Sequence, residues 1–384
     1  MVAHEAARFP LVDLNFVANA QNEWVALIVQ PRHAPVDQVL RALFGGADLL
    51  AAIAPLDCIV PVASTALLTP ELCELLPPGR VVFALSAAAL ADEEEARRAV
   101  QLTDQGYRVL VDGEPAARLP APLRASARDC AASAPPPVSP LFGPHLAYHV
   151  DSCERFGECE NAGYAWFSGA YPLHMPQPDT GHDGTSRRRL LGLLALLARD
   201  ADNRDIEQAL KQDPALSFHL LKLVNSVAFN LHTEITSFAH AITVLGRRQL
   251  QRWLQLLLYA RQRADGPPNL LLPLAALRGA LLEELCRIEA GDREQQDLAF
   301  MCGVFSLLDR LFATPMEEII GALRLPQHVL DALLRHEGVL GARLRLLEAA
   351  PGEDLLAQAG VDTGTWWHSQ LHACHWAIQV SRNV

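Results

Sequence analysis

The sequence lacks any hydrophobic run long enough to cross a membrane. A membrane-spanning helix needs roughly 18–20 apolar residues, and the richest run, residues 190–198, is about half that length and flanked by arginine. The N-terminus also lacks a basic segment followed by an apolar stretch, which excludes a secretory signal of the usual kind. We therefore predict a cytoplasmic protein that is not inserted in a membrane.

The sequence also lacks an excess of basic residues. Its 32 lysines and arginines are outnumbered by 44 aspartates and glutamates, which gives a formal net charge of −12 and a pI of about 5.6. An acidic chain repels a phosphate backbone, so nucleic-acid binding is not expected. The one basic cluster, residues 187–189, is interpreted as a solvated helix start; the alternative is a local contact with an anion.

Closely paired cysteines are missing as well. The eight cysteines stand at positions 58, 73, 130, 153, 159, 286, 302 and 374, and no Cys-x-x-Cys motif occurs. In a chain without a secretory signal, this pattern favours reduced and mostly buried thiols over disulfides or a zinc pair.

The first part of the chain alternates short apolar runs with helical segments. The apolar runs are rich in β-branched residues and are bounded by Gly, Pro or charge, which is typical of buried parallel strands. The strand-like runs are residues 24–30, 57–63, 80–85 and 107–111, and the helical segments between them are 36–43, 69–76 and 92–105. This order predicts an α/β fold with a parallel sheet.

Two segments interrupt this alternation. Residues 114–146 are rich in Pro and Ala and have no period, so we predict a loop or a poorly ordered insert. Residues 173–185 have the composition of a linker. The predicted domains are therefore residues 1–172 and residues 186–384, joined by this linker.

The second domain shows a helical pattern throughout. Leucine recurs at helical spacing from residue 186 onward, which predicts an all-helical fold. Pro315 and Pro326 are placed at helix starts, and Gly246 at a helix end. One longer helix is predicted over residues 292–312, and a final helix over residues 363–380.

The second domain resembles the HDOD domain, a non-catalytic relative of the HD phosphohydrolases. The resemblance lies in the block of residues 212–245, which has an Asp-Pro helix start at Asp213, a Leu-x-x-x-Asn-Ser stretch ending at Ser226, and an Ala-Ile-x-x-Leu-Gly helix end. It covers essentially all of residues 186–384. The implied fold is a bundle of helices without a sheet.

The first domain resembles the EAL domain that precedes HDOD in two-domain signalling proteins. Residues 150–172 (VDSCERFGECENAGYAWFSGAYP) and 75–82 carry this resemblance. Complete EAL domains form a TIM-like barrel that hydrolyses cyclic di-GMP with two divalent metals. Residues 1–172 are few for such a barrel, so we expect a reduced, degenerate EAL barrel followed by the helical HDOD domain.

The resemblance also implies where the catalytic side chains of an EAL domain would stand. Metal-assisted hydrolysis needs several converging carboxylates, and most of the implied positions hold other residues. Those positions read Ala26, Pro61, Ala84 and Tyr148, while Asp112 and Asp151 keep a carboxylate. We therefore predict that the chain is not an enzyme and uses no cofactor. Gln30 replaces an arginine that would hold a phosphate, so cyclic di-GMP binding is not expected either.

No metal site is predicted in the second domain. The His-Asp dipeptide that the HD phosphohydrolases require reads Ser306-Leu307 here. His368, His372 and His375 are weak candidates, because their spacing places three imidazoles on one helix face. The alternative is a half-exposed helix face beside neighbouring tryptophans.

These observations predict a signalling scaffold without catalytic activity, acting through protein–protein contacts with a partner that the sequence does not name. Asn225, Ser226, Arg247 and Arg248 are the candidate ligand or partner surface. A homodimer is compatible with this interpretation. The alternative function is a sensor that binds cyclic di-GMP or another nucleotide without hydrolysing it.

Overall fold

The structure, a computed structural model, describes residues 9–45, 49–116, 118–174, 191–193, 195–196, 202–211, 238–259, 269–321, 323 and 325–383. The chain divides into two compact units, Met1–Met175 and Pro176–Val384, called here the barrel unit and the helical unit. The division falls within the predicted linker, residues 173–185. The predicted fold class, an α/β barrel followed by an all-helical domain, is confirmed.

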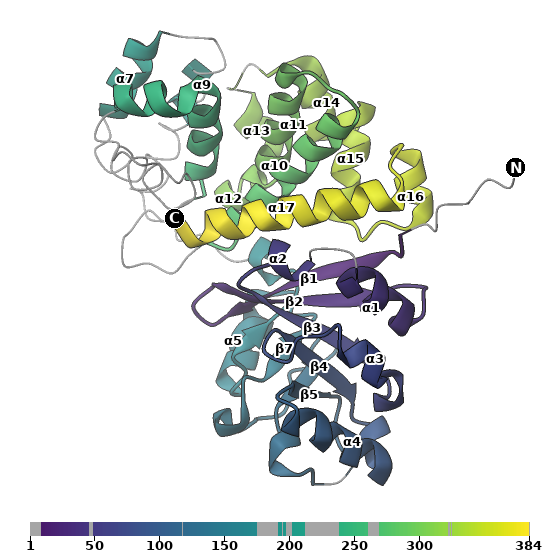
Figure 1. The fold of residues 1–384 in the computed structure, drawn as a ribbon. Coiled ribbons are helices and arrows are strands. Elements are labelled where there is room, and N and C mark those ends of the chain that lie inside the picture. The colour runs from purple at the N-terminus through teal and green to yellow at the C-terminus, as the bar shows by residue number, and fades with distance from the viewer. Residues whose placement is uncertain are drawn as a thin grey trace, which may run out of the picture. The chain divides into compact units, whose positions relative to one another are not determined.

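The strands of the barrel unit close into a barrel in chain order (Figure 1). β1 runs antiparallel to both of its neighbours, β2 and β8, and every other pair is parallel. The strands are β1 (Val12–Asn19), β2 (Trp24–Pro31), β3 (Asp57–Val62), β4 (Val81–Ser86), β5 (Arg108–Asp112), β6 (Ser126–Asp129), β7 (Leu146–Tyr148) and β8 (Trp166–Phe167). The four apolar runs recognised in the sequence form β2 to β5.

The helices of this unit lie around the strands (Figure 1). Three of them begin at side chains suited to capping: Thr69 accepts from Leu72 N–H, Asp92 from Glu94 and Glu95 N–H, and Ser152 from Arg155 N–H. The helices are α1 (Val36–Gly45), α2 (Leu49–Ala52), α3 (Pro70–Cys73), α4 (Glu93–Asp104) and α5 (Cys153–Asn161). Of these, α1, α3 and α4 match the helical segments predicted from the sequence.

The inside of the barrel is filled by apolar side chains. Because side chains alternate between the two faces of a strand, every second residue of each strand points into the lumen. The buried cluster there consists of Val17, Ala26, Ile28, Ile59, Val82, Ala84, Leu110, Ala127, Leu146 and Trp166. The lumen is thus a packed core, and only its ends are open to polar chemistry.

The prediction of a loop or poorly ordered insert over residues 114–146 is wrong in one respect. This segment contributes β6, which pairs with β5 and β7 and completes the barrel. Its remaining described structure is irregular, with single 3₁₀ turns at Ala121–Leu123 and Pro140–Phe142. A strand of four residues is too short to show a period, so its existence depends on the neighbouring strands that hold it.

The described part of the helical unit contains helices and no strand. α10 is apolar on most of its surface and packs against both α11 and α17. The helices are α7 (Asn203–Lys211), α9 (Phe238–Leu257), α10 (Leu271–Ile288), α11 (Arg293–Phe305), α12 (Leu308–Phe312), α13 (Met316–Ile320), α14 (Gln327–Arg335), α15 (Gly338–Glu348), α16 (Glu353–Gln358) and α17 (Thr363–Asn383).

Several predicted helix boundaries are confirmed. α13 and α14 start directly after Pro315 and Pro326, and the helical run of α9 is broken at Gly246, whose φ of 75° favours glycine. The single helix predicted over residues 292–312 is instead two helices, α11 and α12, because Ser306 ends the first. The predicted start of a helix at Asp213 lies outside the described residues.

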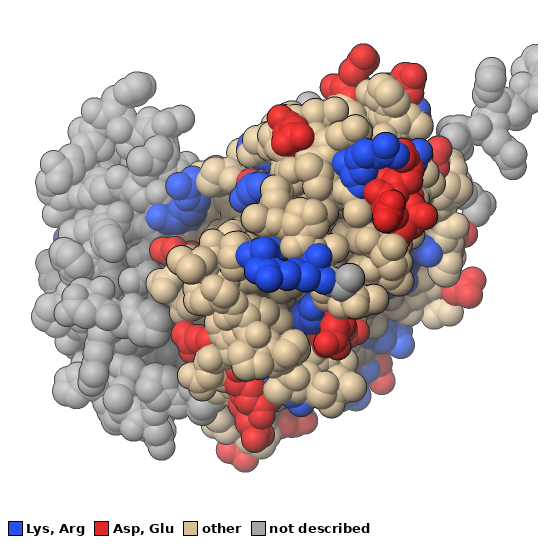
Figure 2. Space-filling view, turned by 90° about the horizontal axis from the view of Figure 1, so that it is seen from below, with Lys and Arg blue, Asp and Glu red and all other residues tan. Residues whose placement is uncertain are grey.

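The charged side chains are mixed in sign on the face shown in Figure 2. One elongated basic group lies near the middle of that face, and acidic groups surround it at a distance. No helix in the described part of the chain is both long and apolar enough to span a membrane.

Candidate functional site

Polar side chains gather at the carboxyl end of three neighbouring barrel strands. The last lumen-facing apolar residues of β5, β6 and β7 are each followed, two positions later, by a polar residue: Asp112, Asp129 and Tyr148. The register pairs Asp129 directly with Tyr148. Active sites of barrels of this kind lie at the carboxyl ends of the strands, so this group is the candidate site of the barrel unit.

Asp112 and Tyr148 form the inner half of this site. The hydroxyl of Tyr148 donates a hydrogen bond of 2.8 Å to Oδ1 of Asp112. Burial raises the pKa of Asp112, and this effect exceeds the opposite effects of the Tyr148 hydroxyl and the Arg128 guanidinium. Burial, and then the neighbouring Asp112, also raises the pKa of Tyr148. The phenol therefore stays protonated and acts as a donor.

Asp129 and His149 form the outer half. Nδ1 of His149 lies 3.0 Å from Oδ1 of Asp129, and both side chains are more than half exposed. Burial alone would raise the pKa of Asp129, but the backbone N–H of Ala131 and the imidazole of His149 lower it. His149 has a φ of 55°, a left-handed conformation that is uncommon outside glycine and typical of functional sites.

This arrangement offers a ligand two kinds of polar group, carboxylate acceptors and an imidazole. A carboxylate such as Asp129 accepts N–H donors. These groups can recognise a polar ligand through hydrogen bonds. Within the described residues, no three or more His, Cys, Asp or Glu side chains are placed to hold a metal ion.

The structure also places the other positions singled out in the first domain. Ala26 and Ala84 lie in the apolar lumen, and Pro61 lies in β3 beside Ala84. Asp151 accepts a 3.0 Å hydrogen bond from the backbone N–H of Ala170 and so holds the turn after β8. At Gly169, a side-chain carbon would lie 2.3 Å from the carbonyl oxygen of Val150, which explains why this turn needs glycine.

Asp129 and His149 were missed by the sequence analysis. Asp129 stands at the end of β6, inside the segment predicted as an insert, and His149 directly follows β7. The available signal was weak: a run of four residues, Ser126–Asp129, with Ala127 as its one apolar residue, in front of a cysteine.

In the helical unit, the three candidate histidines lie on α17. His368, His372 and His375 are all exposed, while Trp366 and Trp367 are buried on the other side of the helix. Nδ1 of His368 lies 2.8 Å from the carbonyl oxygen of Gly364, and Nδ1 of His372 lies 3.8 Å from Glu284. The three imidazoles share the exposed face of α17, but within the described residues they do not form a group that could hold a metal ion.

The candidate partner surface is described only in part. Arg248 lies on α9, half-buried, with Nε 2.5 Å from Asp297 Oδ1 and a second contact of 3.6 Å to Glu283. Arg247 is also on α9, but its side chain is outside the described residues, as are Asn225 and Ser226. Arg248 therefore joins α9 to α10 and α11.

A comparison with protein families identifies part of the helical unit. Residues 190–313 match the HDOD domain. This HDOD region includes the Asn225-Ser226 stretch and helices α7 to α12.

Two curated proteins are similar in sequence over part of the chain. The uncharacterized protein YuxH of Bacillus subtilis is 27% identical over 239 residues, covering 60% of this chain and 58% of YuxH. The cyclic di-GMP phosphodiesterase CdgJ of Vibrio cholerae is 28% identical over 248 residues, covering 62% of this chain and 56% of CdgJ. The matched region thus spans little more than half of each relative.

Similar solved structures include two proteins in complex with c-di-GMP. The PaMucR phosphodiesterase in complex with c-di-GMP has 12% identity and a TM-score of 0.31, covering 42% of this chain and 94% of its own. BlrP1 of Klebsiella pneumoniae, also with c-di-GMP, has 12% identity and a TM-score of 0.31, covering 42% and 54%. A putative phosphohydrolase from Shewanella amazonensis has 14% identity and a TM-score of 0.36, covering 51% and 93%.

These comparisons contradict two predictions. The prediction that the chain is not an enzyme is contradicted by its similarity to CdgJ, a cyclic di-GMP phosphodiesterase. The expectation that cyclic di-GMP does not bind is contradicted as well, because CdgJ is a cyclic di-GMP phosphodiesterase. The segment of residues 114–146, predicted as a loop or poorly ordered insert, supplies Asp129 to the barrel.

Proposed function

We propose that this chain is a signal-transduction protein of the cyclic di-GMP network. In this proposal, the carboxyl end of the barrel receives the dinucleotide, and the helical unit binds a protein partner in the cytoplasm of a bacterium. The observation that carries the proposal is the polar group Asp112, Asp129, Tyr148 and His149 at the open end of an otherwise apolar barrel. The similarity to CdgJ supports the choice of ligand.

The chemistry of the site suits a guanine dinucleotide. The Asp129 carboxylate can accept two N–H donors from one guanine edge, which is a charge-assisted and bidentate contact. The half-exposed His149 can turn toward a phosphate when it is protonated. The hydroxyl of Tyr148 holds Asp112 through a hydrogen bond. Asp112 and Asp129 therefore have different surroundings and different roles.

Calorimetric titration of the full chain with cyclic di-GMP tests the proposal. We expect saturable binding by the unaltered protein and about tenfold weaker binding by Asp129→Asn, since a charge-assisted hydrogen bond is lost. The matched control is Glu160→Gln, an exposed residue at the end of α5, where the chain turns back toward the start of β8. Linear dinucleotide is quantified in the same samples, so that turnover is not mistaken for absent binding.

Absence of a binding signal in the unaltered protein contradicts the dinucleotide part of the proposal. Equal affinities of Asp129→Asn and Glu160→Gln would place the ligand elsewhere. Either result leaves the protein-partner part intact, because it concerns the helical unit.

For the helical unit, we propose that Asn225, Ser226, Arg247 and Arg248 contribute to a protein-binding surface. Charge reversal at Arg247 is the cleanest test, because Arg248 is already engaged with Asp297. Light scattering on the full chain measures whether the partner is a second copy: a dimer mass that becomes a monomer mass in Arg247→Glu supports it. Arg382→Glu, near the end of α17, is the control.

A further inference from the structure

A pocket lies on the side of the barrel, where the segments that follow β5 and β6 form single turns instead of helices. These connections, residues 113–125 and 130–145, contain no α-helix in their described residues. The space that a helix would fill next to β5 and β6 is partly open, with a cavity volume of about 260 Å³. This value is just below the range of roughly 300–1,000 Å³ of typical small-molecule pockets.

The lining of this pocket combines an apolar wall with cations. Its residues are Val111, Pro115, Arg118, Leu119, Leu123, Arg124, Ser126, Arg128, Val138, Ser139, Phe142 and His145. They include three arginines and no aspartate or glutamate. The net charge of the chain is −12, yet the charged side chains that line this pocket are all positive. A concave site with a positive potential attracts anions.

Two of the arginines, Arg118 and Arg124, have guanidinium N–H groups that are available to a ligand. Arg118 is exposed, and within the described residues neither it nor Arg124 has an ion-pair partner. Arg124 lies over the ring of Phe142 at 4.7 Å, and its Nε makes only a long contact of 3.5 Å to the carbonyl of Leu119. The cation–π contact fixes the plane of this guanidinium and leaves its terminal N–H groups available.

The remaining polar groups hold the walls in place. Nδ1 of His145 accepts from the backbone N–H of Ser126 at 3.1 Å, so its Nε2 carries the proton and donates to the carbonyl of Ser139 at 2.9 Å. Arg128 donates to the carbonyl oxygens of Val111, Gly113 and Ala127. These bonds connect β5, β6 and the start of β7, so the pocket is preformed.

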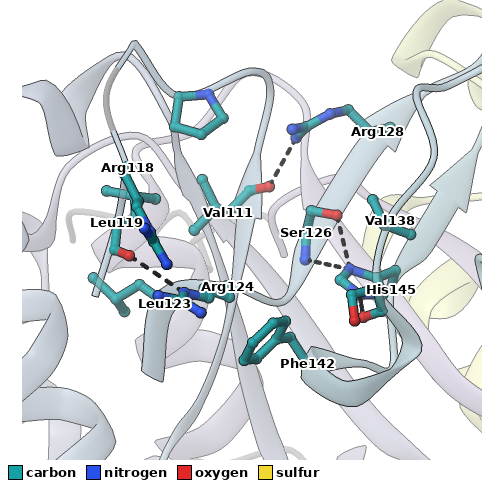
Figure 3. A pocket seen from close by; sticks show the side chains of 12 residues that line it. Val111, Arg118, Leu119, Leu123, Arg124, Ser126, Arg128, Val138, Phe142 and His145 are labelled. Atoms are coloured by element: carbon teal, nitrogen blue, oxygen red, sulfur yellow. Dashed lines mark hydrogen bonds between the residues drawn. The ribbon is translucent and has the colours of Figure 1, made fainter. Parts of the chain in front are cut away.

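Figure 3 shows how the lining residues lie. Arg118, Arg124 and Leu123 lie on one side, Val138 and His145 on the other, and the ring of Phe142 lies between them. A ligand there would meet the guanidinium groups of Arg118 and Arg124 together with nearby apolar side chains.

We propose that this pocket binds a small organic anion. Arg118 and Arg124 hold its acidic head group, and Leu123, Val138 and Phe142 contact its apolar body. This site is separate from the carboxyl end of the barrel, so the inference does not depend on the function proposed above.

Phenyl phosphate is the probe, since it joins an acidic group to a small apolar ring. Binding to the full chain is measured by ligand-observed NMR, with phenol and inorganic phosphate titrated in parallel. We expect phenyl phosphate to bind more tightly than either fragment. Arg118→Gln and Arg124→Gln should each weaken binding by about tenfold, since each removes charge-assisted hydrogen bonds.

Arg97→Gln is the matched control, because Arg97 is an exposed arginine on α4 that does not line the pocket. It changes the net charge equally and should leave the affinity unchanged. Arg118→Gln keeps the test valid if Arg124→Gln unfolds the loop, because Arg118 is exposed. The inference is overturned if phenyl phosphate fails to bind, if inorganic phosphate binds equally well, or if Arg97→Gln weakens binding as much as Arg118→Gln.

Discussion

The barrel unit and the helical unit bury different kinds of polar side chain. Among the described residues, the buried polar side chains of the barrel unit are Thr65, Ser126, His145 and Ser168, and those of the helical unit are Gln255, Glu284, Arg343 and Ser369. The first set contains hydroxyls and an imidazole, whereas the second contains a carboxylate and a guanidinium. Each buried charge has a partner: Arg343 pairs with Glu289, and Glu284 with Arg287.

The difference follows from the geometry of the two units. In the barrel, parallel strands satisfy their own backbone groups, and their short side chains meet in a lumen with no room for a long polar one. Between helices, a long side chain such as arginine can cover apolar surface with its stem and reach a carboxylate with its head. The barrel unit therefore depends on apolar volume, and the helical unit on apolar volume together with paired charges.

The largest effect should come from removing apolar volume in the barrel. Phe83 in β4 is fully buried, with its ring 4.9 Å from that of Tyr107. Phe83→Ala should lower the free energy of unfolding by about 3–5 kcal/mol, since it leaves a cavity. Leu67→Ala is the control, because Leu67 is 38% exposed. Urea unfolding measures both, and equal midpoints for the two variants would refute a core role for Phe83.

Breaking a buried charge pair in the helical unit should cost somewhat less. The side chain of Arg343 is 4% exposed and that of its partner Glu289 is 48% exposed. Arg343→Ala should destabilise by about 2–3 kcal/mol, because solvent screens part of the pair. Arg343→Met, which keeps the apolar stem, should cost about 1 kcal/mol or less.

Hydrogen exchange, followed by mass spectrometry, assigns these losses to one unit. Arg343→Ala should raise exchange in α10 and α15 and leave β2 to β5 unchanged. If Arg343→Met is as unstable as Arg343→Ala, the charge is essential and the comparison drawn here needs revision.

Helix capping should contribute a similar amount to the free energy of unfolding in both units. Asp92 caps α4, and Asp292 caps α11 through a capping box with Gln295. Asp92→Ala and Asp292→Ala should each cost about 1 kcal/mol, with the first slightly larger because the Asp92 side chain accepts from two N–H groups and the Asp292 side chain from one. Thermal unfolding of both variants checks this, and a loss in only one would show that capping depends on its unit.

The smallest expected effects concern how the ionisation of single carboxyl groups changes stability with pH. The direction of the change differs between Glu284 and Asp112. Hydrogen bonds from Arg287 lower the pKa of Glu284 below its ordinary 4.5. Ionised Glu284 therefore stabilises the folded state above pH 4.5, and this stabilisation is lost as the pH falls through the pKa that Glu284 has in the folded protein. Burial raises the pKa of Asp112 above its ordinary 3.8, so its ionisation destabilises the barrel above the folded value and has no effect below 3.8.

Glu284→Gln should therefore destabilise the helical unit at neutral pH, and Asp112→Asn should stabilise the barrel unit there. Both differences should vanish in acid. Urea titrations at pH values above and below 4.5 measure both changes in the free energy of unfolding. If the two substitutions changed this free energy in the same direction, Glu284 and Asp112 could not be one paired and one desolvated carboxyl group.

Much of the fold could be predicted from the sequence. The apolar β-branched runs gave β2 to β5, and the prolines at 315 and 326 gave the starts of α13 and α14. These signals are local: they act through backbone dihedrals and through the burial of adjacent side chains. The candidate site was not predicted: Asp112 was noted as a remaining carboxylate of an EAL site, and Tyr148 as a replaced residue.

The rest depended on contacts between distant segments. β6 is too short and too polar to be recognised alone, and it exists because β5 and β7 supply its hydrogen bonds. That pairing brings Asp129 beside Tyr148 and closes the barrel. The charges of the helical unit likewise found partners on other helices, as Arg343 did with Glu289.

The sequence by itself determined the order of strands and helices, the change from an α/β to an all-helical pattern, and the net negative charge. Tertiary structure alone decided that the barrel closes, which polar residues meet at its carboxyl end, and that three arginines share a pocket on its side. The physical reason is that periodicity reports burial within one element, whereas a site forms where elements far apart in the chain meet.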